Sequence, residues 1–113
     1  MTLLDFDTLR DIALSFPGVT EGETVGLPAF YVHNRILARL LRAGDIALKL
    51  DQMELDFLVE SQPETYHTTE DFRRWWEVRV NFENMTADEF RKLFEKAWRL
   101  RAQKRDLVAF KAR

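Results

Sequence analysis

Three consecutive runs in which every second residue is apolar constrain the fold more than any other feature of this sequence. The runs are residues 29–33, 35–41 and 45–50. This alternation is typical of half-buried antiparallel strands, because successive side chains of a strand point to opposite faces of a sheet. His33-Asn34 and Ala43-Gly44 separate the runs, and Asn and Gly tolerate the positive φ of tight turns. We therefore expect a three-stranded meander.

Apolar residues at helical spacing predict three helices around these strands. The first spans residues 5–15, and the Pro-Gly pair that follows ends it. The second spans residues 51–61 and opens on a pair of acidic residues that resembles a capping box. The third begins at the full capping box of Thr86 and Glu89 and runs to about Arg105.

The remaining segments predict one more strand and two loops. Residues 75–82 alternate, with Trp76 on the core face and Trp75 on the opposite face. Residues 19–28 are expected to form a loop with room for a short strand, and residues 62–74 a second loop. The element order α-β-β-β-α-β-α predicts an α+β fold for a single domain over residues 1–113. Its sheet would be mainly antiparallel, with four to five strands and helices packed on one face.

The composition excludes several classes of protein. The chain has 113 residues and no cysteine, so a disulfide framework, a thiol nucleophile and a Cys-type metal site are excluded. No apolar run approaches the roughly 20 residues needed to span a membrane, and the N-terminus lacks the pattern of a secretory signal. We expect a cytoplasmic protein without a membrane partner.

Charge is distributed unevenly along the chain. Residues 1–90 contain 8 Lys and Arg against 17 Asp and Glu, whereas residues 91–113 contain 9 against 2. A basic C-terminal segment attracts polyanions even when the net charge of the protein is −2. The simpler interpretation is that cations at a helix C-terminus complement the helix dipole.

Several short motifs, in order, resemble a known family. Residues 13–21 are similar to the "ALxLPGVxE" opening of the YjbR/MmcQ-like family, and residues 26–32 to its "WGxPxFxV" segment. Residues 35–40 and 48–50 resemble its "KxFARL" and "LKL" strands, and residues 97–105 its "AxxLxxxKR" ending. The order and spacing of these matches, more than any single one, carry the resemblance.

The resemblance implies a small α+β domain of frataxin-like topology. Family members are named as DNA-binding proteins, on the idea of a double wing built from the hairpins, and they have no assigned catalytic activity. The chain departs from the family pattern at Val25, where Trp is usual, and at Glu70-Asp71-Phe72, where a "PHY"-like segment is usual. Arg74 also stands near the usual position of a Gly.

The sheet face opposite the expected helices is the first candidate site. Cations interleaved with aromatic side chains neutralise phosphates and stack on bases. One face of an antiparallel sheet also meets water without any ligand, and Leu37 and Leu41 on this face would suit a homodimer contact. The polar and aromatic members of the face are Tyr31, His33, Arg35, Arg39, Lys49, Trp75 and Arg79.

Two further clusters supply cations. In Arg73-Arg74-Trp75-Trp76 the guanidiniums either fork onto phosphate while Trp75 stacks, or pair with nearby acidic residues while Trp76 fills the core. The basic end of the last helix suits a nucleic-acid backbone but has no base-reading geometry. The residues expected to contact nucleic acid are Arg39, Lys49, Arg73, Arg74, Trp75, Arg79, Arg99, Arg101, Lys104 and Arg105.

The sequence offers little for catalysis or metal binding. Asp5, Asp7 and Asp11 of the first helix suit the helix dipole better than a hard cation, which needs several oxygens at one point. His33 and His67 lack a third ligand or a nucleophile at a suitable spacing. We therefore expect no catalytic residue, no metal and no cofactor.

Two functional hypotheses follow. The leading one is a non-catalytic DNA-binding protein that holds the phosphate backbone weakly through its basic residues. The alternative is a protein- or small-ligand-interaction module, monomeric or homodimeric, that uses the open sheet face. Only the first predicts an affinity that falls steeply with salt.

Overall fold

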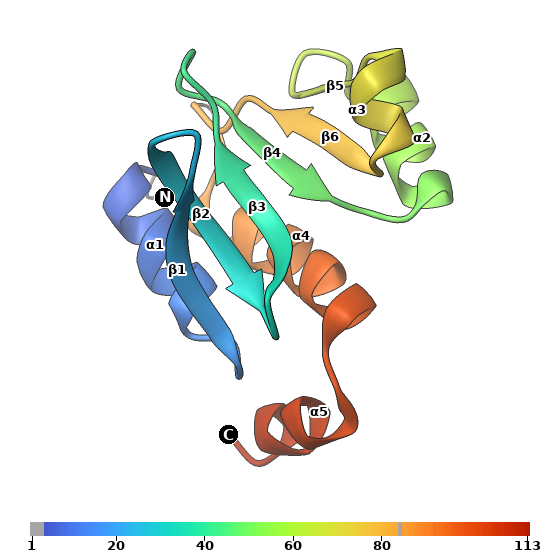
Figure 1. The fold of residues 1–113 in the computed structure, drawn as a ribbon. Coiled ribbons are helices and arrows are strands. Elements are labelled where there is room, and N and C mark those ends of the chain that lie inside the picture. The colour runs from blue at the N-terminus through green and yellow to red at the C-terminus, as the bar shows by residue number, and fades with distance from the viewer. Residues whose placement is uncertain (1–3, 84) are drawn as a thin grey trace.

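The computed structural model describes residues 4–83 and 85–113, and its centre is one six-stranded antiparallel sheet (Figure 1). The strands lie in the order β1-β2-β3-β4-β6-β5. The predicted α+β class is confirmed, with six strands instead of four to five. Within the described residues, no helix is both long and apolar enough to cross a membrane.

The strands are β1 (Val19–Thr24), β2 (Leu27–Val32), β3 (Arg35–Leu40), β4 (Ile46–Lys49), β5 (Tyr66–His67) and β6 (Glu77–Val80). The helices are α1 (Phe6–Leu14), α2 (Gln52–Ser61), α3 (Glu70–Arg74), α4 (Ala87–Arg101) and α5 (Lys104–Lys111).

Side-chain caps set where the long helices begin. Asp5 and Asp51 each accept a hydrogen bond from the backbone amide three residues further on, at 2.7 and 2.9 Å. Thr86 and Glu89 form the predicted capping box at the start of α4. Each cap satisfies an amide that has no partner inside its helix. These contacts confirm the predicted starts of α1, α2 and α4 to within a residue.

The core lies between one face of the sheet and helices α1, α2 and α4, which all contribute buried side chains to it. Phe30, Ala38, Leu48 and Val78 pair in one row across four strands, and each is at most 1% exposed. The alternation of apolar residues therefore identified the buried face of these strands.

Trp98 of α4 joins three distant segments of the core. Its buried ring lies 5.4 Å from the ring of Phe16 and 5.0 Å from that of Phe110 in α5, measured between centroids. Its indole Nε1 donates a hydrogen bond of 2.9 Å to the carbonyl of Pro17. The end of α1, the end of α4 and the C-terminal helix thus depend on one side chain.

A β-bulge overturns the prediction for one residue of β3. Phe30 pairs with Ala38 while Tyr31 pairs with Ile36, so Leu37 is an extra residue on its strand. Leu37 and Ala38 are both buried in the core. Leu37 is therefore absent from the open face, where it was expected to support a dimer contact.

Two segments predicted as loops contain regular structure. Residues 19–24 form β1, which pairs along its whole length with β2, and residues 62–74 contain β5 and α3. An edge strand with mostly polar side chains, such as β1, lacks the alternating apolar signal. Thr69 caps the start of α3, since its hydroxyl accepts a hydrogen bond from the amide of Phe72 at 3.2 Å.

The last predicted helix is in fact two helices. Ala102 is extended, with ψ of 140°, and α5 begins after Gln103. The Asp106 carboxylate accepts a hydrogen bond of 2.7 Å from the Gln103 amide. His33 Nε2 lies 2.6 Å from the same oxygen, so the turn between β2 and β3 holds α5 in place.

Replacing Trp98 by Ala is expected to lower the free energy of unfolding by about 3–5 kcal/mol, since it removes a fully buried aromatic side chain. Urea unfolding of the purified variant measures the change. Trp75→Ala is the matched control, because that indole is 64% exposed and its loss should cost less than about 1 kcal/mol. Equal losses at the two positions would contradict the role given to Trp98.

Stability is expected to fall in acid through Asp106. The hydrogen bond with His33 is the largest effect that lowers the pKa of Asp106, so folding favours the carboxylate. Its contribution is present above the unfolded-chain pKa of about 3.9 and is lost as the pH falls through the lower folded pKa. Unfolding of the wild type and Asp106→Asn should differ by about 1–2 kcal/mol at neutral pH and converge in acid.

The exposed carboxylate of Asp88 provides the control for this pH dependence. Asp88→Asn should change the free energy of unfolding by less than about 0.5 kcal/mol at neutral pH. A difference between wild type and Asp106→Asn that stayed constant from neutral pH to acid would show that the carboxylate charge contributes nothing.

Candidate functional site

Four of the ten residues predicted to contact nucleic acid lie within 3.0 Å of a carboxylate of the protein itself. A cation in such a pair attracts an external phosphate less, because the neighbouring carboxylate offsets its charge. The pairs are Arg39–Glu77, Arg73–Asp56, Arg79–Asp45 and Arg99–Glu95.

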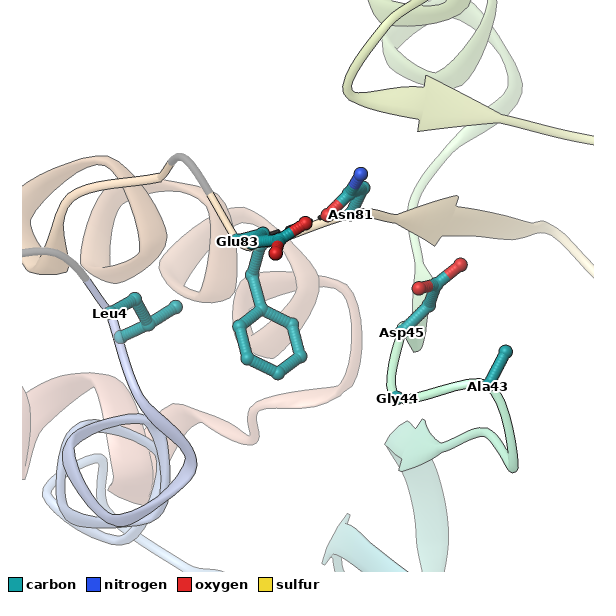
Figure 2. Close-up of a pocket in the computed structure, with 7 residues that line it drawn as sticks. Leu4, Ala43, Gly44, Asp45, Asn81 and Glu83 are labelled. Atoms are coloured by element: carbon teal, nitrogen blue, oxygen red, sulfur yellow. Dashed lines mark hydrogen bonds between the residues drawn. The ribbon is translucent and has the colours of Figure 1, made fainter.

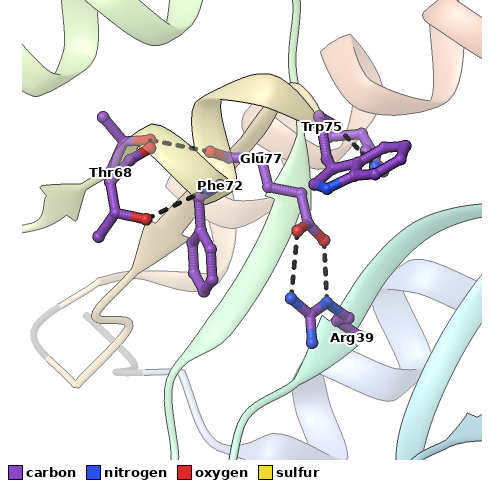
Figure 3. Close-up of polar contacts among 7 residues, drawn as sticks. Arg39, Thr68, Phe72, Trp75 and Glu77 are labelled. Carbon is purple, nitrogen blue, oxygen red and sulfur yellow. Dashed lines mark hydrogen bonds and ion pairs between the residues drawn. The ribbon is translucent and has the colours of Figure 1, made fainter.

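The pair between Arg39 and Glu77 links β3 to β6 on the predicted open face (Figure 3). Its two hydrogen bonds, Nε to Oε2 at 2.9 Å and Nη2 to Oε1 at 3.1 Å, form a fork. The guanidinium also lies 5.5 Å from the ring centre of Phe72 in α3. Helix α3 therefore reaches over this face, which corrects the expectation that all helices pack on the other one.

Another four of the predicted residues meet Trp76 in a groove of about 280 Å³. They come from the ends of β4, α3 and α4, so positions more than fifty residues apart in the sequence become neighbours. We call this site the cation–tryptophan groove, and its lining residues are Lys49, Arg74, Trp75, Trp76 and Arg101.

The backbone after α3 turns both tryptophans outward. Trp76 has a φ of +58°, in the left-handed region, and its amide donates to the carbonyl of Arg73 at 3.0 Å. Strand β6 then begins at Glu77. Trp75 is 64% and Trp76 is 44% exposed.

The prediction that Trp76 fills the core was wrong, because this turn interrupts the alternation that seemed to start at Trp75. The sequence signal for the turn was the helix cap at Thr69, which implies a helix that must end near these residues.

Lys49 lines the groove and holds the backbone of Trp75 in place. Its Nζ donates a hydrogen bond of 2.6 Å to the carbonyl of Trp75. Burial lowers the pKa of Lys49, and the positive charges of Arg101 and Arg39 lower it further, while Glu77 opposes them. Arg101 therefore lies close enough to the ammonium of Lys49 for the two positive charges to repel each other.

Two guanidiniums complete the cationic lining. The Nε of Arg101 is buried and has no hydrogen-bond partner in the part of the chain that the structure describes. Arg74 lies 4.0 Å from Asp71, the limit of an ion pair, and its side chain is 69% exposed. The exposed guanidinium of Arg74 is a planar donor that matches phosphate oxygens.

The two remaining predicted cations, Lys104 and Arg105, are exposed in the first turn of α5. Cations are unfavourable at a helix N-terminus, so the dipole does not account for them as it does for the last turn of α4. The Nη2 of Arg105 lies 3.4 Å from the Nδ1 of His33.

A second hollow, of about 350 Å³, lies between the β3–β4 turn and the segment after β6 (Figure 2). Its charged side chains are Asp45 and Glu83, and Asp45 already accepts a hydrogen bond of 2.7 Å from Arg79. This hollow would repel phosphate. Among residues 4–83 and 85–113, no three His, Cys, Asp or Glu side chains gather as metal ligands would.

Comparison with protein-family models matches residues 14–100 to the family described as YjbR. The match covers more than three quarters of the 113 residues, so the chain belongs to the YjbR family. No curated protein and no solved structure matches the chain. Four of the five groove residues lie inside the matched region, whereas Arg101 and helix α5 follow it.

The pKa of Lys49 is expected to lie below the ordinary value of 10.5 and to rise in Arg101→Gln, because the variant removes a nearby positive charge. The ¹³Cε chemical shift of Lys49 across the alkaline range measures both. Arg91→Gln is the control, since this residue lies ten positions earlier in the same helix, about 15 Å away along its axis. The same Lys49 pKa in Arg101→Gln and wild type would contradict the charge coupling in the groove.

Proposed function

We propose that this YjbR-family chain is a non-catalytic DNA-binding protein of the cytoplasm, and that the cation–tryptophan groove holds the phosphate backbone. One observation carries the proposal. Among the described residues, the three groove cations have a single carboxylate within 4.0 Å, that of Asp71 at the limit. Unpaired cations gathered at one place are what a polyanion requires.

Helix α5 extends this cationic surface. Lys104 follows Arg101 by three residues, so their Cα atoms lie at most about 11 Å apart. A backbone with its phosphates in the groove would then pass close to Lys104 and Arg105. The cations that are paired within the protein contribute little.

The hairpin that a double-wing arrangement would place against DNA has the wrong charge in this chain. Strand β1 carries the exposed Glu21 and Glu23, and Arg10 offsets only Glu21, at 2.9 Å. Carboxylates on the β1–β2 hairpin repel phosphate. We therefore assign the contact to the groove and α5 instead of the hairpin.

The alternative of an interaction module on the sheet face has less support. Leu37 is buried, and Arg39 is held by Glu77, so the face offers fewer apolar and cationic groups than the sequence suggested. Sedimentation equilibrium over a range of protein concentrations tests the homodimeric form. A dimer that Leu41→Asp dissociates would favour this alternative.

Binding to DNA is expected to weaken with salt, and removal of groove cations should reduce this dependence. Each neutralised phosphate contributes about −0.9 to the slope of log K against log salt for a duplex and about −0.7 for a single strand. The double variant Lys49→Gln/Arg101→Gln should therefore reduce the slope by about 1.8 or 1.4. Fluorescence anisotropy of labelled oligonucleotides at several salt concentrations measures it.

The matched control removes two cations from elsewhere on α4. Arg91 and Lys92 are both exposed near the start of that helix, and Arg91→Gln/Lys92→Gln changes the net charge by the same amount. Its slope should equal that of the wild type. Absence of binding at low salt, or equal slopes for the two double variants, would contradict the proposed function.

A further inference from the structure

We infer that the cation–tryptophan groove binds an unpaired nucleotide, whose base stacks on the exposed tryptophans and whose phosphate lies among the groove cations. The inference rests on the proposed function and names its ligand class as single-stranded nucleic acid. Both faces of a paired base are covered by its neighbours in the duplex. An aromatic side chain therefore stacks freely on a base that is unpaired or at an end, whereas inside a duplex it must first separate two stacked base pairs.

The two indoles are the first observation in favour of a single strand. Trp75 and Trp76 are adjacent and both exposed, beside three cations. Large aromatic rings left in water cost free energy unless they are covered part of the time. Rings next to cations are the combination by which single-strand-binding surfaces hold bases and phosphates together.

The second observation is that both backbones are fixed before any ligand arrives. The Trp75 carbonyl accepts a hydrogen bond from Lys49 at 2.6 Å, and the Trp75 amide donates to the carbonyl of Phe72 at 3.0 Å. The Trp76 carbonyl accepts from the Leu50 amide at 3.0 Å. Less ordering is needed on binding when the main chain already holds the rings in position.

The third observation is size. A volume of about 280 Å³ lies just below the range of roughly 300–1,000 Å³ typical of small-molecule sites, so the groove suits one nucleotide at a time. Duplex reading needs a helix or a two-stranded ribbon that enters a groove about 12 Å wide. Helix α3 has five residues, and the β1–β2 ribbon carries carboxylates, so neither suits that role.

The chemistry of the phosphate side completes the site. Arg74, whose side chain is exposed, and Arg101 both line the groove with guanidiniums, the planar donors that match phosphate oxygens. Lys49, which also lines the groove, adds a third positive charge. A nucleotide would thus use its aromatic face and its phosphate at the same time, which neither free phosphate nor a duplex can do.

The test compares a labelled 12-residue oligothymidine with a duplex of equal length, using ring variants that leave every charge in place. Trp76→Gly removes one ring where the left-handed φ favours glycine, so the variant is expected to fold. Trp75→Ala removes the other, and Trp75→Phe restores an aromatic face. The wild type should prefer the single strand, and each ring deletion should lower that affinity about 5-fold to 100-fold.

The salt slope separates the two proposals. Ring deletions should weaken binding without changing the slope, because they remove no cation, and Trp75→Phe should recover most of the affinity. Equal or tighter binding of the duplex, or ring deletions without effect, would overturn the inference and leave the proposed function standing. No binding of either oligonucleotide at low salt would overturn both.

Discussion

The pairing of β4 with β6 is the constraint on which the site depends. It joins residues 46–49 to residues 77–80, across a gap in the sequence that holds α2, β5 and α3. In this register Lys49 of β4 lies opposite Glu77 of β6, and the buried carboxylate of Glu77 accepts both hydrogen bonds of Arg39 from β3, on the other side of β4. The fork occupies both carboxylate oxygens of Glu77, and the Nζ of Lys49 donates its hydrogen bond to the carbonyl of Trp75.

Local signals accounted for the parts of the fold that depend on neighbours in the sequence. Caps at Asp51 and Thr86 positioned α2 and α4, and the period of two positioned β2, β3, β4 and the buried face of β6. These features need only backbone amides and alternating side chains, so they are visible in the sequence. The candidate site was predicted in part for the same reason, since Lys49, Arg74 and Arg101 stand out as charges.

What could not be predicted depends on contacts between distant segments. The bulge at Leu37 follows from its pairing with β2, and the break at Ala102 follows from the docking of α5 through Asp106 and His33. The alternation around Trp76 was misleading because a left-handed turn precedes β6. Carboxylate partners for four of the cations were also invisible, since each pair except Arg99–Glu95 joins residues far apart in the chain.

The ends of the sheet have a consequence for assembly. Its outer strands are β5, with two residues, and β1, whose side chains include Glu21 and Glu23. A short strand offers few free amides to a second sheet, and carboxylates brought side by side repel each other. Joining two copies edge to edge into a continuous sheet is therefore unfavourable. The protein can expose its aromatic rings on a groove without its strands also recruiting further copies.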